Sequence, residues 1–135
     1  MKIVTQMLAD EVYESVNDDG NKVTIDMRKR EDRVALSPVE SILAALGSCG
    51  AVDIVVMLRK RQKSIQKFII ETEGTRRETA PRYFTRIHCH YVVTSKDVTD
   101  EELKKSAALA LEKYCSVAQS LKAEITFSVH VIRPS

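Results

Sequence analysis

The alternation of apolar and polar residues predicts one long buried helix, around which the rest of the chain is arranged. Between Ile42 and Leu58 almost every side chain is apolar or small. This run predicts a single helix from Pro38 to Lys60, about six turns long. Its start is marked by Ser37 as N-cap, Pro38 at the first helical position and Glu40 at the third. Ser-x-x-Glu is a capping box, in which each side chain satisfies a backbone N–H of the other residue.

Shorter alternating segments predict strands on both sides of this helix. Before it, residues 2–8, 11–16 and 23–27 alternate, and the turn residues at 17–21 indicate an antiparallel meander. After it, residues 68–73 and 83–93 predict two strands. A second helix begins at Asp97 or Thr99 and stops near Cys115; a short helical turn over 116–121 and a strand over 123–132 follow.

The order of these elements, βββ-α-ββ-α-β, predicts an α+β fold. In it, a curved antiparallel sheet wraps around the long central helix, within a single domain over residues 1–135. The helix is apolar on more faces than one sheet of this size can cover. We therefore expect a homodimer, in which a second copy covers the remaining face.

Composition and charge narrow the range of partners. The 135 residues are 44% hydrophobic and 30% charged, which is ordinary for a globular domain. With 21 basic and 19 acidic side chains, the chain carries no excess charge that would attract a nucleic acid or a membrane surface. The first residues lack the apolar run of a signal peptide, so we expect a cytoplasmic protein. In that reducing compartment, three cysteines are not expected to form structural disulfides.

Two cysteines are candidates for chemistry. Cys49 lies in the middle of the long helix among small residues, which would let other segments approach its sulfur, and Cys115 lies at the end of the second helix. One interpretation makes both of them small apolar core residues. The other makes them a redox pair, in which a thiolate attacks a peroxide and a second thiol resolves the sulfenic acid. Spacing alone does not decide between the two.

The polar residues near these cysteines give weaker signals. Asp53 lies one helical turn after Cys49, where a carboxylate opposes formation of a thiolate unless a cation neutralises it. On the strand over 83–93, His88 and His90 face one side and Cys89 the other. We expect His90 to lie near the active site or to pair across the strands. A metal site is not expected there, because no third ligand stands at a suitable spacing.

Two motifs together resemble a known family. Ser-Pro-x-Glu followed by Leu-Ala-Ala-x-Gly-x-Cys ends at Cys49, and Lys-Tyr-Cys-Ser-Val contains Cys115. In this order they resemble the OsmC/Ohr family of osmotically induced and organic-hydroperoxide-resistance proteins. The stretch 76–85, His90-Tyr91 beyond it, and Asp53 after Cys49 resemble its YhfA-type branch.

The resemblance implies an intertwined homodimer with the OsmC-like fold and a role in the oxidative stress response. It implies a thiol-dependent peroxidase in which Cys49 attacks an organic hydroperoxide and Cys115 resolves it. An external thiol or dithiol would then reduce the disulfide, with no bound cofactor.

Glu40 is a third candidate for a catalytic residue. It stands one position after the place of the family's catalytic glutamate, which Val39 takes here. No arginine precedes Arg28, so the activating cation would come from the charged loop, where Arg28, Arg30 and Arg33 are candidates and no motif selects one of them.

A second function remains open. Without the activating arginine, the chain could be a non-enzymatic redox sensor or could bind a small apolar ligand in the family's pocket. The two possibilities differ in a measurable way. A peroxidase turns over with Cys49 as nucleophile, whereas a sensor forms the disulfide without turnover. If instead the two cysteines are far apart, both are structural.

Overall fold

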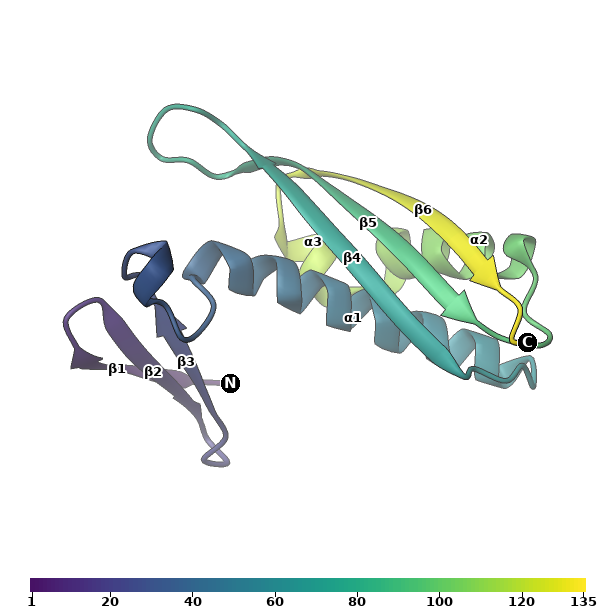
Figure 1. Ribbon diagram of the computed structural model, residues 1–135, viewed down its shortest axis with the longest axis horizontal. Coiled ribbons are helices and arrows are strands. Elements are labelled where there is room, and N and C mark those ends of the chain that lie inside the picture. Colours follow the sequence, from purple (N-terminus) through teal and green to yellow (C-terminus); the bar gives the residue numbers. More distant parts are fainter. The chain divides into compact units, whose positions relative to one another are not determined.

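The computed structural model describes all residues from Met1 to Ser135, and these form two compact units, Met1–Ile42 and Leu43–Ser135. Each unit contains its own three-stranded sheet (Figure 1). The main helices and strands follow one another in the order that the sequence pattern predicts, and the α+β class is confirmed.

The N-terminal unit is an antiparallel meander of β1 (Ile3–Ala9), β2 (Val12–Asn17) and β3 (Lys22–Asp26), as predicted. The turn between β2 and β3 depends on two residues. The side chain of Asn17 accepts a hydrogen bond from the backbone N–H of Asn21 at 2.8 Å, and Gly20 adopts φ +86°, which glycine tolerates best. The predicted turn at 17–21 is therefore confirmed.

A buried carboxylate fixes the loop that follows β3 and contains the 3-10 helix η1 (Arg30–Asp32). Asp26 accepts hydrogen bonds from the guanidinium of Arg28, at 3.1 and 2.8 Å, and from the backbone N–H of Val34 at 3.0 Å. The Arg28 guanidinium and then the Val34 N–H hold the pKa of Asp26 well below its usual range. This ion pair gives the charged loop a fixed structural centre.

Helix α1 (Pro38–Lys60) has the bounds that the sequence predicts. Both bonds of its capping box are present: the Ser37 N–H donates to Glu40 Oε1 at 2.9 Å, and the Glu40 N–H donates to Ser37 Oγ at 3.3 Å. By length and composition alone α1 could cross a membrane, but a core helix passes the same test. Its buried residues lie along one stripe and comprise Leu46, Gly47, Gly50, Ile54 and Leu58.

The sheet of the C-terminal unit contains β4 (Lys67–Arg76), β5 (Phe84–Thr94) and β6 (Glu124–Ile132), in that order. β4 and β5 pair antiparallel as predicted, but β6 runs parallel to β5. The expectation of a wholly antiparallel sheet is therefore wrong for this pair. The reason is the long helical connection between β5 and β6. It returns the chain to the end of the sheet at which β5 begins, so that β6 runs in the same direction as β5.

That connection consists of α2 (Asp100–Leu109), the π-helix η2 (Ala110–Tyr114) and α3 (Ser116–Ser120). Of the two caps considered for the second helix, Thr99 is the one used. Its hydroxyl accepts from the Glu102 N–H at 3.1 Å, and Glu102 Oε1 accepts from the Thr99 N–H at 3.0 Å. The predicted capping box is confirmed.

The helices of the C-terminal unit pack on one face of its sheet. On β5 this face carries Ile87, Cys89, Tyr91 and Val93, all fully buried. The register places apolar residues of β6, such as Phe127 and Val129, beside them. The positions between them form the opposite face. The sheet therefore has a helix-covered inner face and a more polar outer face, and its inner face sets the position of the candidate site.

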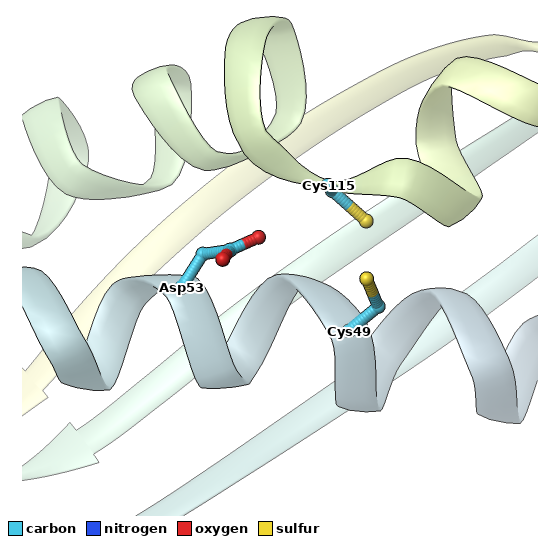
Figure 2. Close-up of side chains that lie close together, drawn as sticks. All are labelled: Cys49, Asp53 and Cys115. Atoms are coloured by element: carbon cyan, nitrogen blue, oxygen red, sulfur yellow. The ribbon is translucent and has the colours of Figure 1, made fainter.

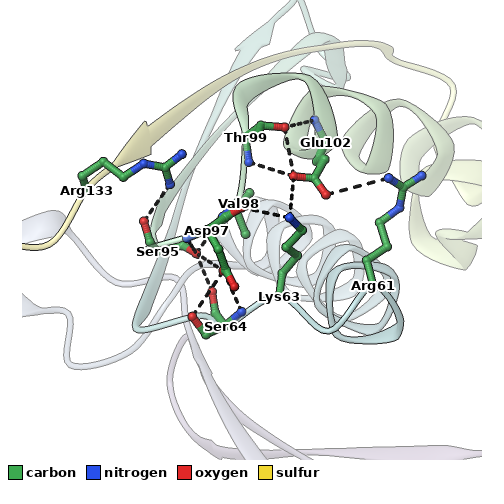
Figure 3. A network of polar contacts seen from close by, with 9 residues as sticks. All are labelled: Arg61, Lys63, Ser64, Ser95, Asp97, Val98, Thr99, Glu102 and Arg133. Carbon is green, nitrogen blue, oxygen red and sulfur yellow. Dashed lines mark hydrogen bonds and ion pairs between the residues drawn. The ribbon is translucent and has the colours of Figure 1, made fainter.

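Polar contacts tie the end of α1 to the start of α2 (Figure 3). Asp97 accepts from the backbone N–H of Ser64 at 3.0 Å and from the hydroxyl of Ser95 at 3.1 Å. Lys63 forms an ion pair with Glu102 at 3.3 Å and donates to the Asp97 carbonyl at 3.1 Å. These bonds fix the loops at one end of the unit, so that α1 and α2 share one helical layer.

Candidate thiol site

Two thiols and one carboxylate meet in the C-terminal unit. One oxygen of Asp53 and the Sγ atoms of Cys49 and Cys115 all lie within 4.8 Å of one another. Figure 2 shows Cys49 and Asp53 projecting from α1 toward Cys115, which comes from the segment between η2 and α3. The structure therefore brings together three residues that the sequence singled out, from two segments far apart in the chain.

Helix geometry explains how α1 supplies two of these groups. Cys49 and Asp53 are four residues apart, so their side chains lie on the same face, one turn after the other. Gly50 follows Cys49 directly and is buried. A Cβ on Gly50 would lie 2.9 Å from the hydroxyl oxygen of Tyr91 and 3.9 Å from Leu111, so the missing side chain leaves room for β5 and η2.

The π-helix η2 positions Cys115. The Cys115 N–H donates to the carbonyl of Ala110, five residues earlier, at 2.7 Å. This wide turn ends the helical run, and Cys115 then becomes the N-cap of α3, with its Sγ accepting from the Ala118 N–H at 3.4 Å. Single π-turns of this kind are frequent at functional sites. The sulfur is thus held in place from both sides.

The two thiols have different surroundings. Cys115 is fully buried, whereas Cys49 is partly exposed. Burial, together with the neighbouring Cys49 thiol, raises the pKa of the Cys115 thiol to about 11, against the opposing effect of the Ala118 N–H. At neutral pH Cys115 is therefore protonated. Of the two residues, Cys49 is the more accessible to solvent.

Asp53 contributes an unsatisfied polar atom to the site. Its Oδ2 is buried and has no hydrogen-bond partner in the chain. An unpartnered carboxylate oxygen away from water is costly, so its position beside two thiols calls for an explanation.

Tyr91 is a neighbour of the site that the sequence reasoning did not select as a functional residue. It is fully buried on the inner face of β5, and its hydroxyl has no partner with hydrogen-bond geometry. Burial raises its pKa, and the adjacent thiols of Cys89, Cys115 and Cys49 raise it further. A usable signal was present: strand alternation that places Cys89 on the inner face also places Tyr91 there.

His90 lies on the outer face of the sheet, as does His88. The Nδ1 of His90 bonds to the hydroxyl of Ser128 on β6 at 2.6 Å, and His88 bonds to Thr126 and Ser128 at 2.7 and 2.8 Å. Of the two expectations for His90, pairing across the strands is the one that the structure shows. Strand alternation keeps it away from the face that carries Cys89.

Glu40 and Arg30 belong to the N-terminal unit. Glu40 is engaged in the cap of α1 and forms an ion pair with Arg33 at 3.8 Å. Hydrogen bonds from the N–H and hydroxyl of Ser37 lower the pKa of Glu40, and so does the charge of Arg33. Arg30 is the first residue of η1 and forms no ion pair. Arg28, another candidate for the activating cation, is paired with Asp26.

A groove opens beside α1 on the side of β4, with a volume of about 390 Å³. Its walls contain both apolar and small polar side chains, and the residues that line it are Leu43, Ala44, Gly47, Ser48, Ile70 and Thr72. Cys49 is not among them.

Comparisons with known proteins agree with this fold. The family model described as OsmC-like protein matches residues 29–130. The protein YhfA of Escherichia coli K12 is 40% identical over 100 residues, which cover 73% of this chain and 75% of YhfA. A crystal structure of a hypothetical protein from Aquifex aeolicus VF5 superposes with a TM-score of 0.87 at 25% identity, over 99% of this chain and 97% of that one.

A more distant structure is the organic hydroperoxide resistance protein OhrB of Bacillus subtilis. It has a TM-score of 0.63 at 16% identity over 96% of each chain, a likeness that concerns the fold. The chain thus belongs to the OsmC-like protein family. Within that family it falls in the branch of YhfA, which confirms the resemblance found in the sequence.

Proposed function

We propose that this protein is a thiol-dependent peroxidase that reduces organic hydroperoxides, with Cys49 as the attacking thiol and Cys115 as the resolving one. The observation that carries the proposal is the approach of the two sulfurs to within 4.8 Å, one partly exposed and the other buried. Such a difference in exposure suits the two roles, because the attacking sulfur must meet the substrate whereas the resolving sulfur must meet only its partner.

The reaction has three steps. The Cys49 sulfur attacks the terminal oxygen of ROOH, the O–O bond breaks, and the products are the sulfenic acid Cys49–SOH and the alcohol ROH. The Cys115 sulfur then attacks the Cys49 sulfur, a disulfide forms, and hydroxide leaves with the thiol proton as water. A dithiol finally reduces the disulfide by exchange, which restores both thiols and yields the cyclic disulfide of the reductant.

The short distance between the two sulfur atoms favours the second step, formation of the disulfide. The sulfurs must close from no more than 4.8 Å to the disulfide bond length of about 2.05 Å, and Cys115 lies at a helix junction rather than inside a helix. The raised pKa of Cys115 keeps it a thiol at neutral pH, so that it competes poorly with Cys49 for the peroxide. We place this chemistry in a cytoplasmic homodimer that uses an external thiol or dithiol as reductant.

The direct test follows the consumption of cumene hydroperoxide by purified, chelator-treated protein with dihydrolipoamide or dithiothreitol. We expect turnover by the wild type and a loss of at least about a hundredfold in Cys49→Ser, which lacks the nucleophile. Cys115→Ser should accumulate a sulfenic acid that dimedone traps. Cys89→Ser is the matched control, because Cys89 is buried outside the three groups that meet, and it should retain turnover. Absence of turnover with both reductants would overturn the proposal.

One observation favours a second candidate, a redox sensor without turnover. The polar group that meets the two thiols is the carboxyl group of Asp53, whereas a fast peroxidase needs a cation beside the attacking sulfur. A sensor would form the Cys49–Cys115 disulfide stoichiometrically with hydroperoxide and would not cycle with dithiols at a useful rate. The same assay separates the two functions, since a sensor consumes about one equivalent and then stops.

A further inference from the structure

The carboxylate of Asp53 is the group in the thiol site that peroxide chemistry does not use. Its Oδ2 is buried without a hydrogen-bond partner, and the group faces two sulfurs rather than a cation. Two thiols and a carboxylate within 4.8 Å of one another form a ligand set for a thiophilic divalent metal ion. A cation bound by this carboxylate would compensate for its buried, unpartnered oxygen.

We propose that Cys49, Asp53 and Cys115 bind a divalent cation of the zinc type when both cysteines are reduced. Zinc binds sulfur at about 2.3 Å and carboxylate oxygen at about 2.0–2.2 Å in tetrahedral sites, which places ligand atoms roughly 3.3–3.8 Å apart. Separations of at most 4.8 Å reach that geometry with small side-chain adjustments. Each thiol that binds gives up its proton to solvent.

The three ligand residues are already held in position by the fold before a metal binds. Cys49 and Asp53 are held one turn apart on α1, and Cys115 is fixed between η2 and α3, so binding requires little ordering of the chain. Three protein ligands leave the fourth position of a tetrahedral ion free for water or another donor. Cys49 is partly exposed, which provides a route for the ion from solvent.

Metal binding and disulfide formation exclude each other here, because both use the sulfurs of Cys49 and Cys115. The bound ion would protect Cys49 from peroxide, and oxidation to the disulfide would release the ion. The inference goes beyond the peroxidase proposal and does not depend on it: a protein that never turns over could bind the metal, and a peroxidase could fail to bind it.

The test uses untagged protein, reduced with a phosphine that is then removed under anaerobic conditions. Co²⁺ serves as the spectroscopic probe, since thiolate ligands give it a charge-transfer absorption in the near ultraviolet and tetrahedral geometry gives it intense visible bands. Zn²⁺ affinity is then measured by competition with a chromophoric chelator. We expect one equivalent of metal per chain in the reduced wild type.

Variants identify the ligands. Asp53→Asn should weaken Zn²⁺ binding by at least about tenfold, because even substitutions of residues that only hydrogen-bond to metal ligands reduce the affinity by that much. Cys115→Ser should remove the charge-transfer band that two thiolates give. Matched controls are Cys89→Ser for the cysteine and Asp100→Asn for an aspartate on a helix surface, and both should bind as the wild type does. Circular dichroism of each variant confirms that it is folded.

Oxidation of the wild-type protein tests the same site without any mutation. After conversion to the disulfide it should bind no Co²⁺, and reduction should restore binding. Absence of thiolate–cobalt absorption in the reduced protein would overturn the proposal, as would an affinity unchanged in both Asp53→Asn and Cys115→Ser. Peroxide turnover, followed separately in chelator-treated protein, shows whether the peroxidase proposal stands or fails independently.

Discussion

The hydroxyl of Tyr91 occupies the space that a side chain at position 50 would need. A Cβ on Gly50 would lie 2.9 Å from the Tyr91 hydroxyl oxygen, closer than Cβ atoms approach other atoms in practice. Tyr91 is fully buried, so it has little room to move away. This contact sets how closely α1 approaches β5 at the turn that carries Cys49.

We predict that Gly50→Ala lowers the free energy of unfolding by about 1–3 kcal/mol. The added methyl group overpacks the interface between α1 and β5, and this cost exceeds the gain in helix propensity of about 1 kcal/mol that alanine brings. Chemical denaturation monitored by circular dichroism measures the change. Equal or greater stability of Gly50→Ala would show that Tyr91 can be displaced.

Tyr91→Phe provides the matched partner in a double-mutant cycle. Removing the hydroxyl eliminates both the collision and a buried polar group without a partner, so Gly50→Ala should cost less in the Tyr91→Phe background, by at least about 1 kcal/mol. Tyr91→Phe alone should not lower stability. If Tyr91→Phe alone lowers the free energy of unfolding by more than about 1 kcal/mol, the hydroxyl forms a hydrogen bond to a group outside this chain, such as water or a partner subunit.

Acid should weaken the contact between the two loops that Asp97 connects. The Ser64 N–H lowers the pKa of Asp97, and the hydroxyls of Ser95 and Ser64 lower it further. Because the folded-state pKa lies below the unfolded one, the carboxylate stabilises the fold above about pH 4, and this contribution is lost as pH falls through the folded-state value. Asp97→Asn should therefore be less stable than wild type at pH 6, and the difference should shrink toward pH 3.

Urea denaturation at each pH measures that difference. Asp100→Asn is the control, since it removes a carboxylate from the first turn of α2 without touching Ser64. A stability gap between Asp97→Asn and wild type that stays constant from pH 6 to pH 3 would contradict the assignment.

The outward side of α1 leads us to expect a homodimer. Val52 is 62% exposed and Val56 is 46% exposed, on a helix that is otherwise apolar for most of its length. A second copy of the chain would cover this apolar surface if the same surface of both copies formed a two-fold interface. Val52→Lys should shift the protein from dimer to monomer, because a lysine there would be desolvated at the interface.

Sedimentation equilibrium distinguishes the two states. Val34→Lys introduces the same charge at an exposed loop position and should leave the dimer intact. A monomeric wild type at micromolar concentration, or a Val52→Lys variant that remains dimeric, would count against this interface.

Local chemistry made much of the fold predictable. The bounds of α1 follow from the Ser37–Glu40 capping box and an uninterrupted apolar run, and the start of α2 follows from the box at Thr99. The parallel direction of β6 was not predictable in the same way. It depends on where the chain returns after α2, η2 and α3, which residue periodicity does not encode.

The site was predictable only in part. The cysteines were identifiable from their motifs, but their approach depends on the packing of α1 against η2 and on a π-turn that has no strong sequence signature. The position of Tyr91 on the inner face of the sheet was predictable from strand alternation alone, since it shares that face with Cys89. The partner of His90 did not follow from the sequence, because its hydrogen bond to Ser128 depends on the pairing of β6 with β5.

The measurement that tests the central claim most directly is the identity of the disulfide formed with one equivalent of cumene hydroperoxide. Reduced protein is treated, free thiols are blocked by alkylation, and peptides are mapped by mass spectrometry without reduction. We predict one intrachain link between Cys49 and Cys115, with Cys89 recovered as an alkylated thiol. Recovery of Cys49 and Cys115 as free thiols, or a link that involves Cys89, would contradict the account.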